Sequence, residues 1–291
     1  APDWLAILFN PSLPYRLSHM LLASLLTVAF LIAGISAWRW LRGQRSASVR
    51  AQLSTGLLLG AVVIPIQVLV GDLHGLNTLE HQPQKVAAME GNWETRGRVP
   101  LLLFAIPDET QRTNHFELAI PAGASLILKH HVDGVVPGLN DFKGEHPPVA
   151  PVFFAFRVMI GVGMLMLFTS WWCGWSWWRR KALSLWQSRL LVAMTFSGWL
   201  ATLAGWYVTE IGRQPYLVQG VLRTADAVSA VPASWIGLSL TIYLAVYLAL
   251  ICAYISVLFY LAGKAESTDD QVVGLGAGSA SWRENTGVKQ A

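Results

Sequence analysis

Glu210 stands at the end of an apolar segment, shortly before an Arg-Gln-Pro turn and a polar loop. A carboxylate at the boundary of the hydrocarbon layer is costly, so such a group usually has a partner or a function. Position alone leaves two interpretations open. Glu210 is either a functional group, or it meets water and head groups and pairs with Arg213 one helical turn on.

His19 and Met159 could bind a metal, and the apolar segments that carry them place both near the same side of a membrane. A histidine and a methionine on facing helices can bind haem iron from opposite sides, which gives an electron-transfer haem. The alternative is that a hydrogen bond caps the histidine and that the methionine only packs. Arg157, two residues before Met159, could pair with a haem propionate or snorkel to the interface.

Lys85 and Glu90 form a third candidate group within the segment QKVAAMEGNWE. Oxidising a quinol removes two electrons and two protons, so a quinol site needs a hydrogen-bond donor, a base and an electron acceptor nearby. A lysine and a carboxylate supply the first two. The alternative is a solvated helix face, because Gln84–Glu94 has the mixed polarity of a short amphipathic helix at the surface.

The elements that must position these residues are membrane spans. Of the 291 residues, 54% are hydrophobic and only 13% are charged, which indicates a membrane protein. The net charge of +4 does not indicate nucleic-acid binding, because the arginines lie beside apolar segments. A helix needs about 20 residues to cross a bilayer. Five segments qualify, namely His19–Leu41, Leu53–Val70, Val152–Trp172, Leu190–Glu210 and Trp235–Leu261.

The basic residues predict the orientation of these spans. The connectors after the first and the third span are rich in arginine and lysine, so both should be cytoplasmic. We therefore expect an all-α integral membrane protein with a long outer loop. Its parts are an outer segment 1–18, two spans in 19–70, the outer loop 71–151, three spans in 152–262 and a disordered cytoplasmic tail 263–291.

Four stretches together resemble subunit I of the cytochrome bd-type quinol oxidases. They are NPSLPYRLSHM, HQPQKVAAMEGNWE, FRVMIGVGMLM and GWYVTEIGRQPYLVQGVLRTADAVS, and they occur in the order of the family. The compact outer loop resembles the short-loop branch, which includes cyanide-insensitive oxidases. Family members begin with several further helices, so this sequence is expected to be the C-terminal part of such a subunit.

The resemblance implies a role for each candidate residue. It implies that His19 and Met159 are the axial ligands of a low-spin haem b of the b558 type. It implies that Glu210 is a ligand in the oxygen-reducing pair, a high-spin haem b and haem d that would be shared with the N-terminal helices. The remaining implied roles are a quinol site at Lys85 and Glu90, an aromatic side chain between haems at Trp206, and haem-adjacent arginines at Arg157 and Arg213.

The implied activity is quinol oxidation at the outer face of a bacterial inner membrane, with electrons passing through haems to reduce O₂ to water. The implied partners are oxidase subunit II, a small accessory subunit and membrane lipid. Two alternatives stay open. One is a haem-free scaffold or transporter-like protein, and the other is an inactive truncated relative.

Overall fold

The computed structural model describes residues 4–142 and 144–284. These residues divide into two compact units, and each is described by itself. The first unit comprises Ala1–Gln44 and Ser48–Val228, and the second comprises Arg45–Ala47 and Ser229–Ala291.

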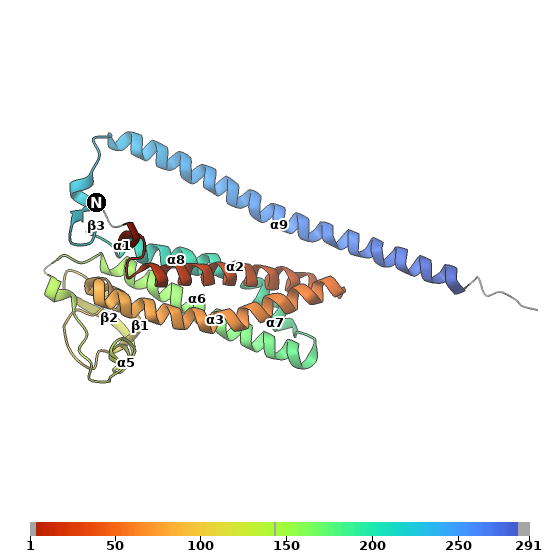
Figure 1. The fold of residues 1–291 in the computed structure, drawn as a ribbon, viewed down its shortest axis with the longest axis horizontal. Coiled ribbons are helices and arrows are strands. Elements are labelled where there is room, and N and C mark those ends of the chain that lie inside the picture. Colours follow the sequence, from red (N-terminus) through yellow and green to blue (C-terminus); the bar gives the residue numbers. More distant parts are fainter. Residues whose placement is uncertain (1–3, 143, 285–291) are drawn as a thin grey trace, which may run out of the picture. The chain divides into compact units, whose positions relative to one another are not determined.

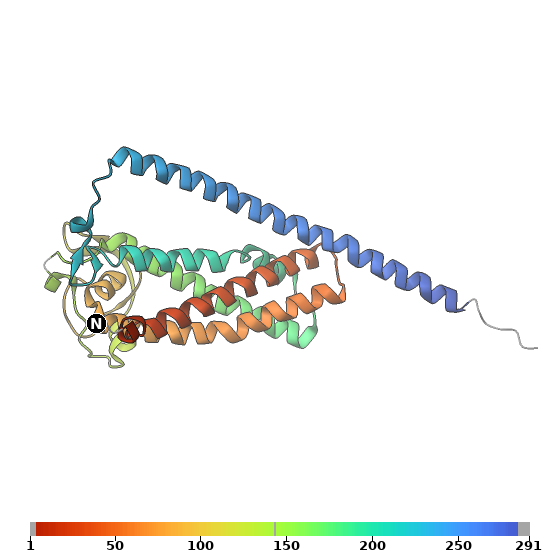
Figure 2. The ribbon, with the colours of Figure 1, turned by 45° about the horizontal axis from the view of Figure 1, so that its top comes forward.

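The first unit is a bundle of long helices that run side by side in both views (Figures 1 and 2). Within the described chain, five candidate membrane spans are long and apolar enough to cross a bilayer, four of them in this unit. This confirms the predicted helical membrane fold. The helices of the unit that build the bundle are α2 (Leu13–Leu41), α3 (Ala47–His81), α6 (Val149–Arg180), α7 (Leu185–Ala193) and α8 (Ser197–Ile211), preceded by the short α1 (Trp4–Leu8).

The helices are longer than the spans expected from hydropathy. The 35 residues of α3 rise about 50 Å at 1.5 Å per residue, whereas the hydrocarbon layer is about 30 Å thick. Hydropathy finds only the part of a helix that lies in lipid, so the predicted Leu53–Val70 misses both ends of α3. Pro65 lies inside the helix.

The predicted single span Leu190–Glu210 is divided between α7 and α8. In the break, the hydroxyls of Thr195 and Ser197 donate to the backbone oxygens of Val192 and Met194, at 2.6 and 2.7 Å. Such local bonds compete with the regular hydrogen bonds of a helix. The break lets both α7 and α8 pack against α2.

The outer loop contains β-structure that the sequence prediction missed. Strands β1 (Leu101–Asp108) and β2 (Thr113–Ile120) pair as an antiparallel hairpin with Leu101 opposite Ile120. Smaller elements complete the outer parts: α4 (Pro83–Glu90), α5 (Gly123–Lys129), η1 (Leu139–Phe142), β3 (Tyr216–Val218), β4 (Leu222–Arg223) and η2 (Thr224–Ala227).

The second unit is built on α9 (Ala233–Glu284). Its first part, Ala233–Leu261, is the fifth candidate span. The helix continues through 263–284, where we expected a disordered tail, and residues 285–291 lie outside the described residues. No proline interrupts 263–284, and a helix already formed in the span can extend without the cost of nucleation.

Candidate functional site

Helix α4 carries Lys85 and Glu90 and is buried rather than solvated. Pro83 lies in its first turn, and Gly91 ends it with a left-handed backbone conformation, φ 66°. Every residue from Gln84 to Glu90 is buried, and α4 packs on α6 and η1. The expectation of a surface helix is therefore wrong, because its mixed polarity serves buried polar contacts and not a face toward water.

Arg157 of α6 holds the C-terminal end of α4. Its guanidinium donates to Glu90 Oε2 at 3.0 Å, to the backbone oxygen of Met89 at 2.7 Å and to that of Leu102 at 2.6 Å. The side chains of Arg157 and Glu90 are only 14% and 7% exposed. Burial raises the pKa of Glu90, and Arg157 opposes that rise. A carboxyl group in this setting is suited to accept and release a proton.

Lys85 lies at the other end of α4, beside the end of α8. A Cβ atom built on Gly212 would come within 2.9 Å of Lys85 Cε. A glycine at position 212 therefore lets the Lys85 side chain lie this close to the end of α8. Burial is the largest of the causes that lower the pKa of Lys85 to about 8; the charges of Arg16 and Arg213 act in the same direction, and Glu210 opposes them. Lys85 thus remains mostly a charged donor at neutral pH.

Glu210 is paired with Arg213, as one of the two interpretations of the sequence expected. The pair spans one turn at the end of α8, and each side chain is about 40% exposed. Arg213 Nε is nevertheless buried and has no hydrogen-bond partner among the described residues. An acidic group of a bound cofactor can accept a hydrogen bond from such an unsatisfied N–H donor.

The side chain of His19, on α2, lies close to residues of α3. Gln67 Nε2 lies 3.2 Å from His19 Nε2, and a Cβ atom on Gly71 would come within 3.3 Å of the same nitrogen. The rings of His19 and His74 are 5.8 Å apart between centroids. Gln67, Gly71 and His74 were not predicted from the sequence, although their spacing of four and three residues places them on one helix face.

Met159 of α6 faces α8. A Cβ atom on Gly205 would lie only 2.9 Å from Met159 Sδ, so a glycine in α8 leaves room for the thioether. Gly205 is five residues before Glu210, which places Met159 near the end of α8. Trp206 does not join this group in the described chain, since it is 55% exposed and its ring lies beside Tyr207 at 5.7 Å.

The donor set fits haem better than a bare metal ion. Among the described residues, no group of three or more His, Cys, Asp or Glu side chains could hold a metal ion. Haem needs only one or two axial ligands from the protein, so single donors on separate helices suffice. Buried Gln67 Oε1 also lacks a partner among the described residues, so polar atoms are unsatisfied beside both His19 and Glu210.

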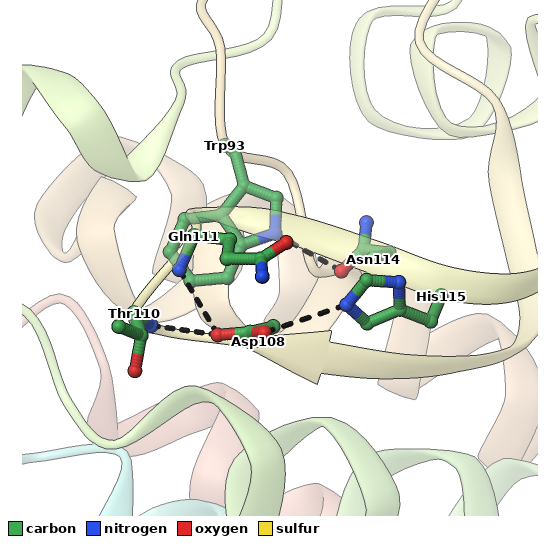
Figure 3. Close-up of polar contacts among 6 residues, drawn as sticks. All are labelled: Trp93, Asp108, Thr110, Gln111, Asn114 and His115. Atoms are coloured by element: carbon green, nitrogen blue, oxygen red, sulfur yellow. Dashed lines mark hydrogen bonds and ion pairs between the residues drawn. The ribbon is translucent and has the colours of Figure 1, made fainter.

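A polar pocket lies next to Glu90, between the end of α4 and the hairpin. It has a volume of about 140 Å³ and is lined by Glu90, Asn92, Glu94, Asn114 and Glu117 among others. Its walls are held by hydrogen bonds. Asn114 Nδ2 donates to Gly91 O at 3.0 Å, and Trp93 Nε1 donates to Asn114 Oδ1 at 3.0 Å (Figure 3).

The turn of the hairpin is fixed by Asp108. Its carboxylate accepts from the backbone N–H groups of Thr110 and Gln111 at 2.8 and 3.0 Å, and His115 lies 3.4 Å away (Figure 3). The N–H of Gln111, more than His115, lowers the pKa of Asp108. The turn is therefore a structural support for the pocket wall.

Comparisons with known proteins show the family of the chain. Residues 1–266 match the family described as cytochrome bd terminal oxidase subunit I. The chain is 32% identical over 241 residues to cytochrome bd ubiquinol oxidase subunit 1 of Bacillus subtilis, covering 78% of this chain and 51% of the relative. It is 27% identical over 312 residues to cytochrome bd-II ubiquinol oxidase subunit 1 of Escherichia coli, covering 83% and 60%.

A solved structure is similar throughout most of the chain. The bd oxidase from Geobacillus thermodenitrificans matches with a TM-score of 0.78 and 32% identity, over 88% of this chain and 59% of that one. The chain thus spans about half to three fifths of the length of these relatives. With a family match over nearly its whole length and several spanning helices, the chain is a multi-pass membrane protein that belongs to the cytochrome bd terminal oxidase subunit I family.

Proposed function

We propose that the chain is part of a respiratory terminal oxidase that oxidises quinol and reduces O₂ to water. The observation that carries this proposal is the burial of α4. One buried helix brings Lys85 beside Glu210 and Arg213, and brings Glu90 to Arg157, two residues from Met159. The quinol-site candidates thereby adjoin the haem-ligand candidates.

The proposed quinol chemistry uses the two ends of α4. Lys85 donates a hydrogen bond to an oxygen of the head group, since it is buried and mostly protonated at neutral pH. Glu90 accepts a proton from a quinol hydroxyl, and Arg157 stabilises the carboxylate that performs this step. Each quinol loses two electrons and two protons in total.

Haem would supply the electron acceptors and the oxygen-reducing centre when bound. His19 and Met159 would hold a low-spin haem b of the b558 type, and Glu210 would hold a haem of the pair formed by high-spin haem b and haem d. Arg213, whose Nε is orphaned, would pair with a propionate. Arg157 donates three of its five N–H groups to α4 and β1, so the other two would remain for a haem propionate.

The proposed setting is a bacterial inner membrane with loop 71–151 outside. Arg39 and Arg42 flank the end of α2, and Arg179 and Arg180 end α6; both helix ends lie away from the β1–β2 hairpin (Figure 1). Basic ends favour the cytoplasm, which supports an outer loop. Protons would be released outside and taken up inside, which generates a proton gradient. Subunit II and a small accessory subunit are the proposed partners.

Glu90→Gln tests this proposal in the assembled oxidase. The amide is nearly isosteric and keeps a hydrogen-bond acceptor for Arg157, but it cannot take a proton. We expect quinol oxidation to fall strongly while the haem content stays that of the native enzyme. Unchanged quinol oxidation, or equal losses of turnover and haem, would contradict the proposed role.

A further inference from the structure

We propose that the pocket between α4 and the β1–β2 hairpin is the exit through which Glu90 passes protons to the outer water. This inference rests on the proposed function, because it assumes that Glu90 takes protons from quinol. It names the route that those protons follow next.

The position of Glu90 between two different environments supports the route. Its Oε2 is held by the Arg157 guanidinium at 3.0 Å. The same residue contributes to the lining of the pocket. A carboxyl group that is buried, ion-paired and next to a polar cavity can receive a proton from one side and release it to the other.

The pocket can hold the water that this step needs. Its volume of about 140 Å³ is several times what one water molecule requires. Polar side chains line it, so waters would find hydrogen-bond partners there. Glu94 and Glu117 in the lining are exposed to solvent, so the pocket joins buried Glu90 to the surface.

Each proton transfer at Glu90 breaks one O–H bond and forms another. The O–H bond of a quinol hydroxyl breaks and an O–H bond forms on Glu90, and a bound haem would take the electron. That new O–H bond then breaks, and the proton joins a pocket water and passes to the bulk. Glu90 returns to the carboxylate paired with Arg157, ready for the second proton.

Access of water to position 90 is measured directly by cysteine labelling. We would place Glu90→Cys in an assembled oxidase with Cys173→Ser and Cys252→Ser, and add a small charged methanethiosulfonate from the outer side. The thiol at 90 should react. The matched control is Met89→Cys, because Met89 is equally buried but does not contribute to the pocket lining, and it should stay unreactive.

Filling the pocket should then close the route. Thr113 lines the pocket, so Thr113→Trp places an indole in it, whereas Thr110→Trp puts the same ring on the hairpin turn outside the lining. We expect Thr113→Trp to slow labelling at 90 by about tenfold or more, as when access requires a rare opening. In the enzyme that keeps Glu90, Thr113→Trp should also slow quinol oxidation and enlarge its solvent isotope effect, while the haem content stays unchanged.

The two hypotheses fail in different ways. No labelling at 90, or labelling and turnover that are the same in Thr113→Trp and Thr110→Trp, would overturn the exit route. Full quinol oxidation by Glu90→Gln would overturn the proposed function and would leave the labelling pattern unchanged. If Glu90→Cys does not assemble, the turnover and isotope effect of Thr113→Trp against Thr110→Trp decide the matter alone.

Discussion

Arg157→Leu should release the outer loop from α6, and the size of the effect can be worked from its contacts. The native guanidinium donates to Glu90, Met89 O and Leu102 O, in three bonds of 2.6 to 3.0 Å. Removing one partner of a buried ion pair costs about 3–5 kcal/mol, because the other charge stays buried. The free energy of local opening of the loop should fall by a similar amount, which makes opening at least about a hundredfold more frequent.

The same substitution should make the loop sensitive to pH. Burial already raises the pKa of Glu90 above its ordinary value of 4.5, and Arg157 opposes the rise, so the pKa rises further without Arg157. The closed loop then binds a proton more tightly than the opened loop. Its stability is therefore fully present in acid and is lost as the pH rises from about 4.5 through the raised pKa.

The measurement is the rate at which a protease cuts the loop in the assembled oxidase, at mildly acid and mildly alkaline pH. Arg98→Leu is a matched control, because Arg98 pairs with Asp133 at 3.7 Å in the same loop but both side chains are more than half exposed. That pair should contribute about 0–1 kcal/mol. Glu90→Gln added to Arg157→Leu should restore part of the resistance.

Two outcomes would refute this reasoning. Arg157→Leu could leave the loop as resistant as Arg98→Leu does, which would mean that the buried contacts do not hold it. Alternatively, the double variant that carries both Arg157→Leu and Glu90→Gln could be no more resistant to the protease than Arg157→Leu alone. In that case the buried charge on Glu90 is not what destabilises the loop.

Three further predictions follow from single contacts. Because the pKa of Lys85 is about 8, binding of a quinol analogue should weaken as the pH rises through about 8, and Lys85→Met should bind weakly without that pH dependence. Gly205→Ala should displace the flexible Met159 side chain and change the low-spin haem spectrum at little cost in stability, whereas Gly161→Ala, with nothing within 4 Å, should leave the spectrum native. Trp93→Phe keeps an aromatic ring but loses the hydrogen bond to Asn114 of the hairpin, so the loop should be less stable by about 0.5–1.5 kcal/mol and a protease should cut it faster; a native cutting rate would contradict that contact.

The length of the apolar segments was enough to predict the spans, because lipid imposes length and apolarity on each helix. It could not predict the break between α7 and α8, which depends on the Thr195 and Ser197 hydroxyls and on close packing against α2. The strands β1 and β2 were also missed. Apolar runs of that length fit either a strand or a buried segment, and only the pairing partner decides.

The candidate site was only partly predictable. Residue type and motif pointed to Lys85 and Glu90, and the Glu210–Arg213 pair follows from spacing alone. The Glu90–Arg157 pair joins residues 67 positions apart, so no local pattern could reveal it. Its consequence is that Arg157, which the resemblance implies to lie near a haem, also holds the outer loop to α6.

The most direct test of the whole account is the reduced-minus-oxidised visible spectrum of the assembled oxidase carrying Met159→Leu. Leucine keeps the apolar volume but removes the thioether, so the protein should insert and assemble normally. We predict that the low-spin b-type signal disappears or becomes high-spin, while the other haem signals remain. A native low-spin signal would contradict the assignment of Met159 and with it the proposed link between α4 and an electron-transfer haem.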